Sequence, residues 1–218
     1  MKTILLAVAL SAGFAAAASA EIHGSWTATY DEQHEGRLQL SIVRGGWNHF
    51  GSPMKISDFA GLTLAQIESS AQAPVQFTLP REAGTVTFEG TFKRGDGAGQ
   101  FRFEQNRGYL DALRSVNVPF EIRRDRENDS DEKALFQLAL FDVSTAYIRS
   151  MQDLGYRESL ETYKKMRLFG VTPEFVRQLS AEGYSNLPAD KLVKLKIHGV
   201  DINYIRKMNS IEKDEDRR

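Results

Sequence analysis

Two clusters of residues combine side chains that proteins use to recognise ligands. The first follows Arg44, where Trp47, Asn48, His49 and Phe50 stand among turn-forming residues. Rigid aromatic side chains in a loop are typical of recognition surfaces. We predict a loop here that either presents its rings to a ligand or folds Trp47 and Phe50 back over the end of a barrel of strands.

The second cluster is an arginine that recurs at one position of a sequence repeat. Arg149, Arg177 and Arg206 are offset by 28 and then 29 residues. Equivalent residues of stacked repeats lie on one face, so we predict a basic stripe that binds an acidic peptide or an anionic glycan. In the alternative, each arginine pairs with a nearby acid such as Asp153 or Glu182.

The sequence lacks the patterns of the common catalytic and metal sites. It has four histidines, none in a His-x-x-x-His pair, and no cysteine, which excludes disulfides, thiolate metal sites and a cysteine nucleophile. No Gly-x-Ser-x-Gly motif is present. The glycines of residues 95–99 lie between two expected strands, where a hairpin turn is a better interpretation than a phosphate loop. We predict no catalytic residue, no metal and no cofactor.

The first 20 residues have the composition of a secretory signal peptide. Lys2 gives a positive start, residues 4–16 are apolar, and Ala18-Ser19-Ala20 is a small-residue cleavage site. We expect cleavage after Ala20 and a mature protein that is periplasmic or secreted. No later apolar run is long enough to be a transmembrane segment. The nearly equal numbers of basic and acidic residues, 28 and 29, argue against a nucleic-acid partner.

Residues 21–105 alternate between apolar and polar side chains, which predicts a small antiparallel β-sheet or open barrel. Thr63 and Gln66 have the spacing of a capping box and predict one short helix among the strands. Asp96-Gly97 is expected to supply the positive φ of a tight hairpin. We predict about five strands, at residues 23–30, 37–44, 75–79, 85–92 and 99–103.

Residues 106–210 change to a helical period and repeat themselves, which predicts about three and a half stacked helical hairpins of an α-solenoid type. Each first helix is expected to begin at an N-cap, Ser144, Thr172 or Asp201. Gly155 and Gly183 are expected to end the first two of these helices in the left-handed conformation. Residues 211–218 have the composition of a charged tail. The predicted fold class is therefore α+β, with the β domain first and the helical repeats after it.

Residues 170–184 fit throughout the motif Gly-Val-Thr-Pro-Glu-Phe-Val-Arg-x-Leu-x-x-x-Gly-Tyr. Together with strands such as Arg-Leu-Gln-Leu-Ser-Ile, this motif resembles a family of exported bacterial proteins that couple a small β domain to tandem helical repeats. Similar segments form the extracytoplasmic region of chains with a BlaR/MecR-type membrane metallopeptidase domain. The earlier copy departs from the motif at residues 142–147. Because the chain lacks the peptidase's His-Glu-x-x-His motif, the resemblance implies an architecture and export but no catalytic residue.

These observations favour an exported, non-enzymatic interaction protein whose repeats present a surface to a protein or peptide partner. A second hypothesis is an extracytoplasmic sensor or regulatory module linked to a BlaR/MecR-type peptidase system. A third is a hydrolase that uses polar groups of the segment from Trp47 to Met54.

Overall fold

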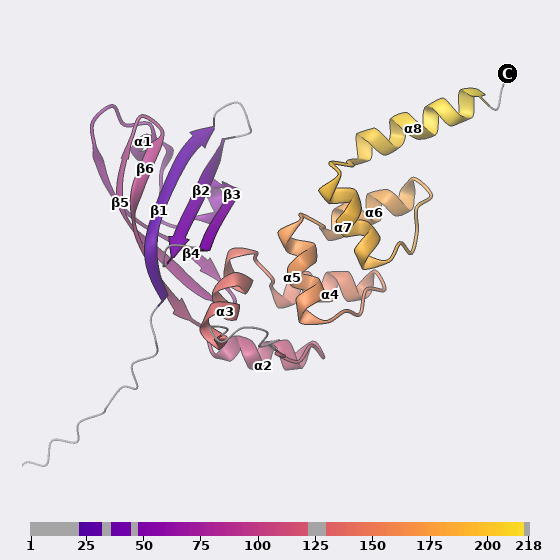
Figure 1. The fold of residues 1–218 in the computed structure, drawn as a ribbon, viewed down its shortest axis with the longest axis horizontal. Helices are drawn as coiled ribbons and strands as arrows, with labels where there is room; N and C mark the ends of the chain where they lie inside the picture. Colours follow the sequence, from indigo (N-terminus) through magenta and orange to yellow (C-terminus); the bar gives the residue numbers. More distant parts are fainter. Residues whose placement is uncertain (1–21, 32–35, 45–47, 122–129, 216–218) are drawn as a thin grey trace, which may run out of the picture.

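The computed structural model describes residues 22–31, 36–44, 48–121 and 130–215 (Figure 1). The predicted signal peptide and Trp47 lie outside these residues. The described chain is an antiparallel sheet followed by short helices, so the predicted α+β class is confirmed. In Figure 1 the sheet stands on one side, and the helices run from its lower end away to the other.

The sheet has six described strands, all antiparallel to their neighbours, in the order β3-β2-β1-β6-β5-β4. Their apolar side chains alternate with exposed ones, and the buried side forms the core. The strands are β1 (Ile22–Asp31), β2 (Arg37–Arg44), β3 (Asn48–Lys55), β4 (Ala73–Arg81), β5 (Gly84–Lys93) and β6 (Asp96–Gln105).

The prediction of a loop after Arg44 is wrong from Asn48 onward, because these residues form strand β3. The strand pairs with β2 from Arg44 opposite Asn48 to Arg37 opposite Lys55. It contains Pro53, which has no amide hydrogen to donate. An edge strand tolerates proline, whereas a central strand does not. Gly51 and Pro53 therefore gave β3 the composition of a loop.

The tight hairpin between β5 and β6 turns two residues earlier than predicted. Arg94 and Gly95 carry the positive φ angles, 51° and 90°, while Asp96 already pairs with Lys93. Gly97 is needed for a different reason. A Cβ atom there would lie 2.5 Å from the ring of Phe92.

Trp26 occupies the centre of the sheet core, above a pair of glycines. Its indole nitrogen donates a hydrogen bond to the Gln100 carbonyl at 3.0 Å. Gly99 lies opposite Trp26 on β1 and opposite Gly90 on β5. A Cβ atom on Gly99 would lie 1.9 Å from the carbonyl oxygen of Glu89. The strands can approach this closely only because neither glycine has a side chain.

The chain after β3 connects this edge strand to β4, the strand at the opposite edge of the sheet. A short 3-10 helix, η1 (Ile56–Asp58), leads to Ala60, which makes an isolated bridge to Thr78 on β4. Helix α1 (Leu64–Ile67) follows, and the capping box of Thr63 and Gln66 is confirmed. Ile67 is buried in the core at this end of the sheet.

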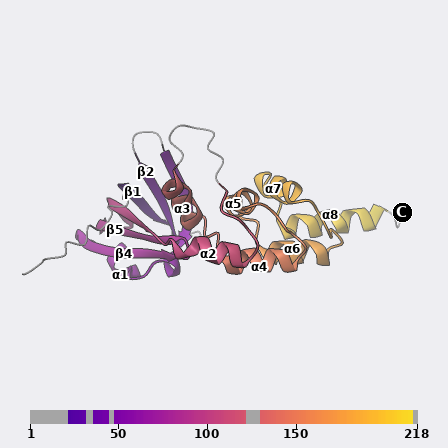
Figure 2. The ribbon, with the colours of Figure 1, turned by 90° about the horizontal axis from the view of Figure 1, so that it is seen from below.

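The helices after the sheet form two rows, α2, α4, α6 and α8 in one and α3, α5 and α7 in the other (Figure 2). Helix α3 joins the rows to the sheet, because its Phe136 ring stacks on Phe101 at 5.4 Å between centroids. The bounds are α2 (Gly108–Ser115), α3 (Asp131–Leu140), α4 (Thr145–Asp153), α5 (Leu160–Leu168), α6 (Pro173–Ala181), α7 (Ala189–Ile197) and α8 (Ile202–Glu215).

Replacing Gly99→Ala is expected to lower the free energy of unfolding by about 3 kcal/mol, because the methyl group collides with backbone atoms that cannot rotate away. Chemical denaturation measures the change. Gly51→Ala on β3 is the matched control, since a Cβ atom there meets only ordinary contact, at 3.8 Å from Gln39. Equal stability of the two variants would contradict this account of the core.

Candidate binding surface on the helical repeats

The predicted ends of the repeated helices are confirmed. The side chains of Ser144 and Thr172 accept hydrogen bonds from the backbone amides of the third helical residues, at 3.1 Å in both copies. Asp201 does the same for α8 at 2.8 Å. Gly155 and Gly183 have φ angles of 93° and 95°, and each ends a first helix in the left-handed conformation. The repeats therefore share one local geometry.

Tyrosine hydroxyls connect successive repeats. Tyr109 of α2 donates to the carbonyl of Val143, and Tyr147 of α4 donates to Val171 at 3.0 Å. Each acceptor precedes the next first helix. Burial raises the pKa of both hydroxyls well above the usual value, and for Tyr109 the negative charges of Glu82 and Asp142 raise it further. These hydroxyls stay neutral and act as donors over the whole physiological range.

The three repeated arginines lie on the row of first helices, but their surroundings differ. Arg206 pairs with Glu182 of the preceding repeat at 2.7 Å, as the alternative interpretation expected. Arg177 pairs with Glu174 of its own helix at 3.7 Å, with both side chains more than half exposed. Arg149 is exposed and makes no ion pair with any described residue. Arg149 and Arg177 therefore lack a close acid partner, although the side chain of Arg206 is as exposed as that of Arg177, at 56% against 54%.

A pocket of about 190 Å³ lies beside Arg177, where α4 ends against α6. Tyr156 forms one wall and is held there because its hydroxyl donates to the Leu187 carbonyl at 2.8 Å. Exposed hydroxyl and amide groups complete the rim, so aromatic rings, polar groups and one cation meet in one hollow. The other lining residues are Leu154, Val176, Ser180, Tyr184, Ser185 and Asn186.

The aromatic segment of the first cluster is only partly described. Phe50 is half-buried and packs against Phe141 at the end of α3, with 5.4 Å between ring centroids. It lines a second pocket of about 140 Å³ between the β2–β3 edge and α3, with Arg44 and Phe136 among the other lining residues. The side chains of Asn48 and His49 lie outside the described set. Phe50 and the three arginines belong to separate surfaces.

A polar cluster joins the sheet to the helices, and sequence reasoning missed it. The carboxylate of Glu82, in the β4–β5 turn, accepts from the amide of Thr145 at 2.6 Å and from its hydroxyl at 2.8 Å. Arg81 lies 3.6 Å from Asp142, whose carboxylate also accepts from Arg167 at 2.9 Å. No local sequence signal indicates a contact across such separations. The cluster fixes the start of α4 against the β4–β5 turn of the sheet.

The pocket beside Arg177 was also missed as a unit. Its one signal in the sequence is the tyrosine after each helix-ending glycine, Tyr156 and Tyr184, a position whose side chain commonly packs back onto the helix it follows. Tyr156 does so and is buried, whereas Tyr184 is exposed. The loop that supplies Ser185 and Asn186 has no counterpart in the motif.

Comparisons with models of protein families, with curated proteins and with solved structures found no match. Among the described residues no group of three or more His, Asp or Glu side chains is placed to hold a metal ion. Within the same residues, no helix combines the length and the apolar character needed to cross a membrane.

The tyrosine contacts predict a stability that is lost in alkali. A raised folded-state pKa favours the neutral hydroxyl, so its contribution is complete below the unfolded pKa of about 10 and is lost as the pH rises toward the folded value. Burial raises the pKa of four tyrosines, Tyr109, Tyr147, Tyr156 and Tyr163. We expect the free energy of unfolding to fall steeply above pH about 10.

Tyr147→Phe is expected to lose about 1 kcal/mol at neutral pH and to show a shallower alkaline decline than the native chain. Denaturant titrations at several pH values measure both effects. Tyr204→Phe is the control, because that hydroxyl makes no hydrogen bond with described residues. An unchanged alkaline slope for Tyr147→Phe would refute the assignment.

Proposed function

We propose that the protein is an exported, non-enzymatic interaction protein whose helical repeats bind an acidic segment of another protein or peptide. The observation that carries the proposal is the pocket of about 190 Å³ that places Arg177 beside two tyrosines between successive repeats. Tyrosine and arginine are the residue types most enriched at the energetic centres of protein interfaces. The composition of the first 20 residues, which is that of a signal peptide, supports the exported location.

The electrostatics of the surface favour a carboxylate ligand. The ion pair of Arg177 with Glu174 is long, at 3.7 Å, and exposed, so it contributes little and a ligand can displace it. Arg149 stands at the same repeat position on the neighbouring helix α4, without an ion pair among the described residues. An arginine binds a carboxylate through two parallel hydrogen bonds. The segment would place an acidic side chain on each arginine and an apolar or aromatic one in the pocket.

The test uses a fluorescein-labelled peptide with the sequence Gly-Glu-Glu-Tyr-Glu repeated twice, and its counterpart with glutamine in place of glutamate. Fluorescence anisotropy is expected to show binding of the glutamate peptide alone, weakened by salt. Arg177→Ala should lower the affinity about tenfold or more, because a charge-assisted hydrogen bond is lost. Arg149→Ala should have a smaller effect in the same direction.

Arg114→Ala is the matched control. Arg114 lies on α2 in the same row of helices and also pairs with an acid one turn away, Asp111, but it is not among the residues that line the pocket beside Arg177. Its replacement is expected to leave the affinity unchanged within twofold. Equal binding of the two peptides, or equal losses for Arg177→Ala and Arg114→Ala, would overturn the proposal.

A further inference from the structure

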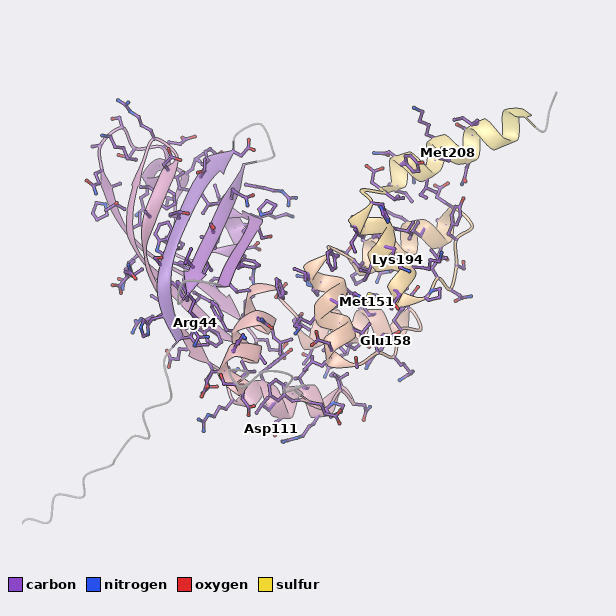
Figure 3. All side chains as sticks on the ribbon, viewed as in Figure 1. Arg44, Asp111, Met151, Glu158, Lys194 and Met208 are labelled. Carbon is purple, nitrogen blue, oxygen red and sulfur yellow. The ribbon has the colours of Figure 1, made fainter. Side chains whose placement is uncertain are left out.

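Helix α8 repeats α4 and α6, but one of its faces is uncovered. Tyr204 stands where the earlier copies have Tyr147 and Phe175, and its exposed fraction is 52% against 7% and 6%. Met208 stands where they have Met151 and Leu179, and it is 45% exposed against 0% and 1%. Ile211, one turn further along the same face, is 44% exposed. Figure 3 shows Met208 on α8, at the end of the helical rows farthest from the sheet.

The opposite face of α8 is firmly attached to the preceding repeat. Ile205 is buried, and Arg206 pairs with Glu182. The side-chain oxygen of Asn209 accepts a hydrogen bond from the Tyr184 hydroxyl at 3.0 Å. The exposed stripe of Tyr204, Met208 and Ile211 is therefore presented by a fixed helix, on the side directed away from α6.

The earlier repeats show what kind of element fits such a stripe. On α4 the cover is α5, whose Tyr163 ring meets Tyr147 edge-on at 6.3 Å between centroids. Arg167 of α5 places its guanidinium 5.1 Å from the centroid of the same ring. On α6 the corresponding cation is Lys196 of α7, 4.6 Å from the Phe175 centroid. In both repeats the aromatic ring is covered by a second helix that carries a cation near its end.

The two covering helices share one spacing. Apolar residues stand at positions i, i+3 and i+6, and the cation follows at i+7. These are Leu160, Tyr163, Met166 and Arg167 in α5, and Ala189, Leu192, Leu195 and Lys196 in α7.

We propose that the stripe of Tyr204, Met208 and Ile211 is the docking site for a basic amphipathic helix of another protein chain with this spacing. Its apolar residues would cover Met208 and Ile211, and its lysine or arginine would stack on the Tyr204 ring. The Tyr204 hydroxyl would donate to a carbonyl just past the end of that helix, as Tyr147 does to Val171. The surface is separate from the Arg177 pocket, so it adds a second partner site to the proposed function.

The test uses a peptide with the sequence of residues 159–171, because this segment carries the required spacing. A lactam bridge between Glu161 and Lys165, which are exposed in α5, holds it in a helix. Fluorescence anisotropy with the full chain is expected to show saturable binding. Tyr204→Ala and Met208→Asp should each weaken it at least tenfold, whereas Arg177→Ala should not change it. This last result separates the stripe from the pocket.

Two controls make the interpretation specific. In the peptide, Arg167→Ala is expected to weaken binding about threefold and Arg167→Lys to restore it, because either cation stacks on an aromatic ring. In the protein, Leu64→Asp changes an equally exposed apolar residue far from α8 and should leave binding unchanged. Because the altered residues are exposed, circular dichroism should report an unchanged fold.

Undiminished peptide binding by Met208→Asp would overturn the proposal. So would sedimentation showing that the native chain is a dimer and that Met208→Asp converts it to a monomer. A second copy of this chain would then cover the stripe.

Discussion

The placement of α4, and of the repeats that follow it, depends on the carboxylate of Glu82. It accepts the amide and the hydroxyl of Thr145, at the start of α4, from a turn 63 residues earlier in the sequence. A negative charge at a helix N-terminus satisfies free backbone donors and interacts favourably with the helix dipole. Asn106 also holds this turn, since its side chain donates a hydrogen bond to the Glu82 carbonyl at 2.9 Å. The sheet thereby sets the position at which α4 begins.

From α4 onward each helix is stabilised by its contacts with neighbouring helices. Each first helix of about nine residues is too short to be stable alone, so it depends on the second helix packed over it and on the next repeat. The tyrosine hydroxyls of α2 and α4 set the spacing between repeats, because their acceptors lie at the entrance to the following unit. The same logic makes the last repeat exceptional. Its apolar face has the residues for a neighbour that the described chain does not supply.

Local features of this fold could be predicted from the sequence, because their causes are local. The caps at Ser144 and Thr172 and the left-handed glycines depend on residues within one turn, and the repeat confirms them twice. Strand β3 could not be predicted, since an edge position tolerates the proline and the glycine that indicate a loop. The cluster of Arg81, Glu82 and Asp142 could not be predicted either, because the sheet brings together residues that no spacing relates.

The candidate site could likewise be predicted from the sequence only in part. The recurrence of Arg149, Arg177 and Arg206 was visible in the sequence, and so was an acid partner for one of them. Which arginine lacks a close acid partner depends on two substitutions between copies. Glu182, the partner of Arg206, is replaced in the preceding repeat by Leu154, which lines the pocket beside Arg177 instead of neutralising it.

The second substitution concerns Arg149. Glu174, one turn before Arg177, is replaced by Ala146 at the corresponding position of α4. Arg149 therefore has no acid one turn before it on its own helix, and the structure shows no ion pair for it within the described residues. A repeated residue thus acquires different environments because its neighbours diverge while the fold of the repeat stays the same. Any ligand of this surface should discriminate between the repeats by these neighbours, since the arginine itself is common to all three.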